Sequence, residues 1–206
     1  SLGLVGSEMC IRDSSSISGA TIGRTRATDA VLGGAIDGDE STLSAELGEA
    51  TLTDFSHEAL TADTLSTTGT TLAANADSVH ASADQVRGSN IRTTNLRAAS
   101  LSAEGGTASV DQGTAFAAFD QAQVSDATIL DRVDLTTADV TGLEASTTGP
   151  QSTVQFASGS ISGVSDRVTG AALTEAALTQ GTFGHNARTA GVTGQLAQAD
   201  ISGLSG

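Results

Sequence analysis

Residues 117–142 read AAFDQ, AQVSD and ATILD, then VDLTT and ADVTG after a one-residue slip at Arg132. In each of these pentads the first residue is small, the third is apolar and the last two are mostly polar. A period of five fits neither the 3.6-residue period of a helix nor the two-residue alternation of a simple strand. It suits a coil that turns a corner every five residues and presents one small and one large side chain inward on each side.

The same phase returns in other parts of the chain, at residues 15–34, 89–103, 171–185 and 194–203. Between these runs the register slips, at residues 39–48, 67–88, 104–114 and 145–152. Glycines and Pro150 cluster in several of the slips, as expected of loops that bulge from a repeat array. The pattern therefore predicts an array of repeats interrupted by irregular loops.

Four short segments carry a resemblance to a known family. They combine a small residue, Asp or Asn, and a branched apolar residue, as in Val133-Asp134-Leu135 and Thr94-Asn95-Leu96. Similar triplets begin at Ala138 and Ala199. Runs of such pentads resemble the pentapeptide-repeat family. The resemblance implies an all-β fold, a right-handed parallel β-helix that forms a four-sided solenoid with irregular loops.

Burial follows from the same pattern, because one pentad cannot bury its central side chain alone, whereas stacked coils line up their apolar residues. We expect the central residues to be buried and the first residues to face inward. The central residues are Phe119, Val124, Ile129, Leu135 and Val140, and the inward-facing first residues are Ala117, Ala122, Ala127 and Ala138. The alternative is a disordered low-complexity segment. The phased Ile, Leu and Phe residues argue against it.

The N-terminal segment has a different origin from the repeats. Residues 4–14, LVGSEMCIRDS, match the translation of a transposase-based sequencing-library adapter. We therefore expect residues 1–14 to be non-native and to make no packed contribution, so that their deletion leaves the melting temperature unchanged. Residues 15–206 are expected to form one β-solenoid domain, a fragment truncated at both ends. The only Met and the only Cys, Met9 and Cys10, lie in the adapter-like segment.

Charge limits the classes of partner. The formal net charge is −15, from 24 acids against nine cations, all of them arginines. Residues 27–86 hold eleven acids and no arginine. This balance opposes phosphate binding, so we expect no nucleic-acid partner. No apolar run is long enough to span a membrane, so no membrane insertion is expected. The composition leaves cytoplasmic and secreted locations open.

The residue types exclude most catalytic chemistry. Without lysine there is no P-loop and no Schiff base, and without Cys beyond the adapter-like segment there is no thiolate nucleophile. The three histidines, His57, His80 and His185, have no second ligand at a recognisable spacing. We interpret them as exposed polar residues on the solenoid wall. We therefore expect no enzyme activity, no catalytic residue, no cofactor and no metal ion.

Two clusters resemble binding sites. Residues 37–40, DGDE, offer the hard oxygens that suit Ca²⁺, but Thr42 stands where an EF-hand needs glycine and Gly48 replaces its bidentate Glu. A solvated acidic loop is the preferred interpretation, with a Ca²⁺ site as the alternative. Arg87, Arg92 and Arg97 share one pentad position, so on a four-sided coil they are expected to face three directions as dispersed charges.

These observations favour a non-enzymatic scaffold or protein-interaction element. Its protein partner is unknown, and end-to-end self-association of coils is possible. One alternative is an acidic DNA mimic that acts on a type II topoisomerase through residues 27–86. The acids Asp54, Glu58 and Asp63 are nevertheless expected to be scattered over several sides. The other alternative is a segment of a secreted adhesin or fibre.

Overall fold

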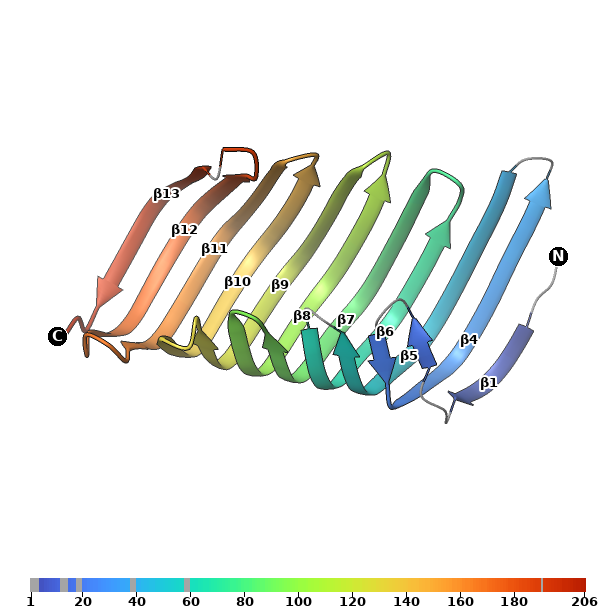
Figure 1. The fold of residues 1–206 in the computed structure, drawn as a ribbon, viewed down its shortest axis with the longest axis horizontal. Helices are drawn as coiled ribbons and strands as arrows, with labels where there is room; N and C mark the ends of the chain where they lie inside the picture. The colour runs from blue at the N-terminus through green and yellow to red at the C-terminus, as the bar shows by residue number, and fades with distance from the viewer. Residues whose placement is uncertain (1–3, 12–14, 18–19, 38–39, 58–59, 190) are drawn as a thin grey trace.

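The computed structural model describes residues 4–11, 15–17, 20–37, 40–57, 60–189 and 191–206. They form one β-sheet, with no helix in these ranges (Figure 1). The strands are β1 Leu4–Ile11, β2 Ser15–Ile17, β3 Ala20–Ile22, β4 Arg24–Asp37, β5 Glu40–His57, β6 Leu60–Ala74, β7 Ser78–Thr93, β8 Leu96–Asp111, β9 Thr114–Ile129, β10 Val133–Thr148, β11 Gln151–Asp166, β12 Ala172–Asn186 and β13 Gly191–Ser202.

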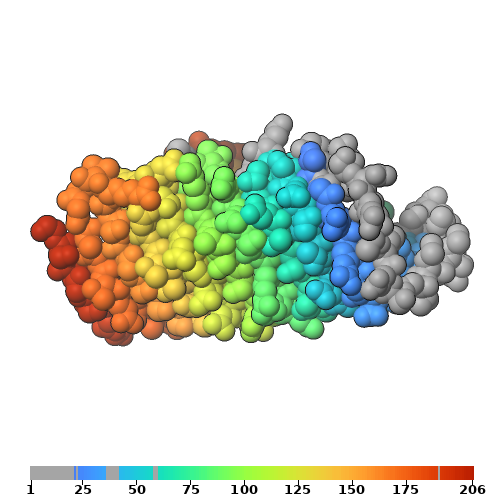
Figure 2. All heavy atoms as spheres, turned by 90° about the horizontal axis from the view of Figure 1, so that it is seen from below, coloured from blue at the N-terminus to red at the C-terminus, as the bar shows by residue number. Residues whose placement is uncertain are grey.

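The long strands β4 to β13 follow one another as hairpins, each beside the next in sequence order. Figure 2 shows the result as colour bands that run in chain order along the long axis. The all-β repeat architecture is as predicted. The parallel β-helix is wrong, because every strand pairing in the described residues is antiparallel.

Each long strand bends at two corners, where the regular pairing skips one or two positions. The first set of corners, corner line A, consists of Asp29, Gly48, Gly69, Asp84, Gly105, Asp120, Gly142, Ala157, Gln180 and Ala197. The second, corner line B, consists of Gly23, Asp54, Asp63, Asn90, Ala99, Asp126, Thr136, Gly163, Thr174 and Gly203. Along both lines every second residue has a positive φ, as do Gly105 (61°) and Asp126 (47°).

The two corner lines divide the sheet into three parts. We call the five-residue strip between the lines the base, the part beyond line A the long arm and the part beyond line B the short arm. Both arms fold toward the same side of the base. Ile91 of the short arm lies over Gly88 of the base, and the Phe156 ring of the long arm lies over Gly159. The sheet is therefore hooked in cross-section, as the curved lower ends of the strands show (Figure 1).

The corners explain the five-residue period. Within a straight part, alternate residues face the concave side, but a corner inserts one extra residue and makes the step three. Two plus three gives a pentad, as in the series Ala117, Ala122 and Ala127, whose corners are Asp120 and Asp126. The pentads are real, but the chain reverses after each bent strand instead of completing a coil.

The core inside the hook is thin. Its buried residues are Ala62, Ile91, Ala98 and Ala127, and they are packed against Leu60, Leu65, Leu96, Leu101, Val124 and Leu135. Of the residues expected to be buried, Phe119, Val124, Leu135 and Val140 are only half-buried and Ile129 is exposed. Ala127 is buried, and Ala117, Ala122 and Ala138 are half-buried. The open hook, unlike a closed coil, leaves one side of these residues uncovered.

The adapter-like segment takes part in the sheet, contrary to the expectation that it stays apart from the fold. Residues 4–11 form β1, which pairs with β4 from Leu4 opposite Leu32 to Ile11 opposite Thr25. Residues 1–3 and 12–14 lie outside the described residues. The non-native origin of residues 1–14, and the effect of their deletion on the melting temperature, stay predictions.

Candidate interaction surfaces

The outer surface of the base is lined by hydroxyl groups. Cross-strand pairing places Thr64, Ser89, Ser100, Ser125, Thr137 and Ser162 in one row across six strands. Hydroxyl oxygens in this row lie 2.7 Å apart in Thr64 and Ser89, and 3.0 Å apart in Ser100 and Ser125. Because hydroxyls both donate and accept hydrogen bonds, the row forms a zipper and keeps capacity for further partners.

Two further polar rows run beside the hydroxyl row. The row next to line A holds Thr68, Gln85, Glu104, Gln121, Thr141 and Ser158. In it, Gln85 donates to Glu104 at 3.3 Å and the hydroxyls of Thr141 and Ser158 lie 2.6 Å apart. The middle row holds Ser66, Arg87, Ser102, Gln123, Asp139 and Ser160. Three rows at regular strand spacing make the outer face of the base polar across the central strands.

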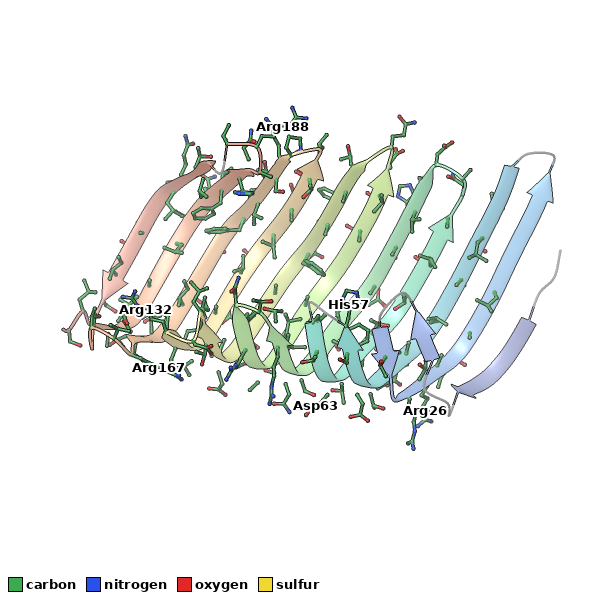
Figure 3. The ribbon with its side chains drawn as sticks, viewed as in Figure 1. Arg26, His57, Asp63, Arg132, Arg167 and Arg188 are labelled. Carbon is green, nitrogen blue, oxygen red and sulfur yellow. The ribbon has the colours of Figure 1, made fainter. Side chains whose placement is uncertain are left out.

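Ion pairs join the turns at the end of the short arm, where Figure 3 labels Arg132 and Arg167. The Arg132 guanidinium donates to both carboxylate oxygens of Asp166, with Nε 3.0 Å from Oδ1. Arg167 binds Asp134 through two nitrogens, with Nη2 2.7 Å from Oδ1. Two-nitrogen contacts of this kind fix the relative orientation of the groups. The two neighbouring turns at this end, between β9 and β10 and between β11 and β12, are therefore tied together.

Electrostatics at these turns favours the ionised carboxylates. The hydrogen bonds from Arg132, together with the backbone N–H of Val168, hold the pKa of Asp166 well below its usual range. Arg167 and the hydroxyl of Thr128 lower the pKa of Asp134 in the same way. The pKa of each arginine is raised by its carboxylate partner. The two arginine side chains are about half exposed and the two carboxylates are half-buried. With these pKa shifts all four groups stay ionised near neutral pH, so they act in pairing the turns.

The concave side of the long arm carries apolar side chains that no described residue fully covers. Leu43, Val79, Val110, Val154 and Phe183 are between 38% and 52% exposed. On the opposite side of the long arm, His80 and Phe116 border an open groove of about 550 Å³. The groove also has small polar residues such as Ser82 and Thr107 along its walls. Glu46 and His80 are the titratable residues that line this groove.

The histidines lie on three different strands: His57 on β5, His80 on β7 and His185 on β12. In the part of the chain that the structure describes, no group of three or more His, Cys, Asp or Glu residues could hold a metal ion. Asp37 and Glu40 pair at the end of the hairpin between β4 and β5. Residues 38–39, the middle of the acidic DGDE segment, lie outside the described residues, so the Ca²⁺ alternative stays untested.

The arginines of the central repeat do not face three directions. Arg92 and Arg97 are direct cross-strand partners, so they lie on the same side of the short arm, whereas Arg87 lies on the base. Arg97 is also 3.3 Å from Asp131. The expectation of three directions rested on a closed coil. In the hooked sheet the hairpin between β7 and β8 brings two of the three together.

Acidic residues occupy corners. Asp54 and Asp63 both lie on corner line B, on neighbouring strands, so this pair is not scattered as expected. Glu58 lies outside the described residues. Asp84 and Asp120 lie on line A opposite Gly69 and Gly105, where a Cβ on either glycine would collide with the facing carboxylate. The pentads predicted corners but did not identify the corner residues, although Asp54, Asn90 and Asp126 recur at intervals of 36 residues.

Comparison of the chain with protein-family models, with curated proteins and with solved structures finds no match. The described residues include no helix that is long and apolar enough to cross a membrane.

Proposed function

We propose that this protein is a non-enzymatic structural element, a stiff ribbon that holds a flat polar surface for contact with another protein. The base supports the proposal, because it keeps three polar rows in register across the central strands. A flat surface of this kind suits an extended partner better than a small molecule, which needs a concave pocket.

Stiffness has two sources in the sheet. Each long strand pairs with its neighbours along most of its length, and the arginine–carboxylate pairs tie successive turns. The corner residues also have restricted conformations, because a non-glycine residue with positive φ is held by its surroundings. The distance between two points on the base should therefore be nearly constant.

That distance is measurable with spin labels at Glu49→Cys and Thr179→Cys in a Cys10→Ser background. Both labelled positions are exposed and lie in the same row as Gln121. They are seven strand spacings apart, about 34 Å. Double electron–electron resonance should show one narrow distribution near this distance. A broad distribution, with circular dichroism still showing an all-β protein, would contradict the stiff ribbon.

Contact with a protein partner needs a separate test. Ser100→Arg and Ser125→Arg place bulky charges in the hydroxyl row, and Val168→Arg places the same charge on an exposed turn. A partner that uses the base should be lost from cross-linking to the first two variants and kept by the third. Equal cross-linking to all three would exclude the base as the contact surface.

We do not favour the DNA mimic as the proposed function, because uncharged residues interrupt both lines of corner acids. On line B, Asn90 and Ala99 lie between Asp63 and Asp126, and Thr136 follows Asp126 on the next strand. Phosphates in a duplex follow one another without such interruptions. The adhesin alternative stays compatible with the ribbon, since a stiff polar element suits a fibre as well.

A further inference from the structure

The outer edge of β13 is open. β13 pairs with β12 on one side, and no described strand pairs with its other side. All twelve residues of β13 are exposed, including Val192, Leu196 and Ile201. The strand has no proline and one charged residue, Asp200, so it lacks most of the devices that keep edge strands from pairing.

The edge at the other end of the sheet accepts an antiparallel strand. β4 is the first long strand, and β1 of the same chain pairs along its outer edge from Thr25 to Leu32. This stretch of β4 passes through the base and around corner line A. The backbone of β4 is thus shaped to take a strand that bends at Asp29.

β13 and β4 match as neighbours. The ten long strands alternate in direction, so β13 runs antiparallel to β4, and a copy shifted along the sheet would continue the alternation. One corner of β13 is Ala197 and the other is Gly203, directly after the strand. For β4 the corners are Asp29 and Gly23, directly before the strand, so the two corners are six residues apart in both cases. Both corners coincide in one register, with residue 198 opposite residue 28. In this register Ala197 meets Asp29 and Gly203 meets Gly23. Of these four residues, only Asp29 and Gly203 have a positive φ, so positive φ would still occur at every second residue along both corner lines.

Side chains agree with this register. Ala199 comes opposite Ala27, and Ile201 comes opposite Thr25, in the same inward rows that they occupy in each copy. Asp200 comes opposite Arg26, which gives opposite charges in a direct cross-strand pair. The twofold alternative, β13 against β13, would instead bring Asp200 near its own copy and place a long arm against a short arm. Charge and shape therefore select the translated arrangement.

We propose that copies of this chain associate end to end, the open edge of β13 pairing with the β4 edge of the next copy in the place that β1 occupies. β1 competes for this edge from within the same chain, at the millimolar effective concentration typical of a short linker. The full chain is then mostly monomeric at micromolar concentration. Weakening β1 exposes the β4 edge and allows the copies to assemble.

Proline in β1 tests the competition. Backbone N–H groups alternate between facing β4 and facing away, so one of Glu8→Pro and Met9→Pro removes a pairing hydrogen bond. Analytical ultracentrifugation of the full chain should give a mass near 20.3 kDa, and at least one proline variant should give multiples of it that grow with concentration. Adding Ile201→Lys should restore the monomer, whereas Gln121→Lys, on the central strand β9, should not.

Disulfide trapping tests the register. In the associating variant with Cys10→Ser, Thr28→Cys with Gln198→Cys should form covalent ladders on oxidation, because the two positions lie at opposite ends of one copy. Thr28→Cys with Ser202→Cys, four residues out of register, should form few. The proposal is overturned if both proline variants stay monomeric with an all-β circular dichroism spectrum. It is also overturned if Ile201→Lys leaves association unchanged or both cysteine pairs cross-link equally.

Discussion

Gly105 lies opposite Asp120 at a corner of the sheet, and a Cβ on Gly105 would overlap the Asp120 carboxylate. Gly105 also has a φ of 61°, a backbone conformation that residues other than Gly, Asn and Asp rarely adopt. The pair therefore combines a backbone requirement with a close approach. The same combination occurs at Gly69 and Asp84, two strands earlier along the sheet.

Gly105→Ala should lower the free energy of unfolding by about 2–4 kcal/mol, because backbone strain and overpacking add. Gly113→Ala is the matched control, since Gly113 has a φ of 83° but nothing within 4 Å of its would-be Cβ. Its cost should be only the strain, about 1–2 kcal/mol. Urea unfolding measures both. In a double-mutant cycle, Asp120→Gly should recover part of the Gly105→Ala loss, and strictly additive effects would contradict the collision.

Ile91 is the one large apolar side chain that is buried among the described residues, with 5% of its surface exposed. Ile91→Ala should cost about 2–4 kcal/mol of unfolding free energy, because it removes the side chain that closes the short arm over the base. Leu130→Ala, on an exposed turn, should change stability by less than about 0.5 kcal/mol. Equal losses in urea unfolding would mean that the inside of the hook is not the core.

The pentads predicted corners and an inward row of small and large residues, and the structure has both. The predicted parallel direction of neighbouring strands was wrong. Inward and outward residues alternate in the same way in parallel and antiparallel sheets, so the pentads could not distinguish the two. The register slips held the missing information. The slips at 104–114 and 145–152 contain the two-residue turns Gln112-Gly113 and Gly149-Pro150, and the slip at Arg132 marks another turn.

Turn chemistry could have been recognised in part. Gln112 and Gly113 both have positive φ between the paired residues Asp111 and Thr114, the backbone of a type I′ hairpin. Asn-Gly or Asp-Gly would have signalled it clearly, whereas Gln-Gly signals it weakly. Leu130 and Asp131 adopt positive φ without any glycine. Their conformation is set by the hairpin and its ion pairs, which no local pattern shows.

The surfaces were harder to predict than the corners. Hydroxyl rows arise only when Thr64 and Ser89, 25 residues apart, become cross-strand neighbours. Arg132 and Asp166 meet across an even longer separation of 34 residues. Such contacts depend on the length of the hairpins. The coil expected from the pentads has no hairpins, so it would bring other residues together.

Stability should depend on pH through the ion pairs at the short-arm turns. The Arg132 guanidinium lowers the pKa of Asp166, so the ionised carboxylate favours the folded state. This contribution is fully present above the unfolded pKa of about 3.9 and is lost as pH falls through the lower folded pKa. Asp166→Asn should therefore destabilise the protein at pH 7, and its difference from the parent should shrink below about pH 4.

Thermal unfolding followed by circular dichroism across this pH range measures the effect. Asp111→Asn removes the same charge at a hairpin of the long arm and serves as the control. A difference for Asp166→Asn that stays constant down to strongly acidic pH would show that the carboxylate's charge is not what stabilises the turns.

The full chain should not inhibit DNA gyrase supercoiling at micromolar concentration. Its corner acids do not form two continuous lines of charge, because residues such as Ala99 and Thr136 interrupt line B and glycines interrupt line A. Asp63 is moreover engaged by Asn90, whose side-chain amide donates to it at 2.6 Å. A topoisomerase groove that binds two strands of phosphates therefore faces a ribbon with uncharged gaps in its lines of acids, which should bind weakly. Inhibition that rises with concentration and disappears in the variant Asp54→Asn, Glu58→Gln and Asp63→Asn would establish the DNA mimic in place of the structural element.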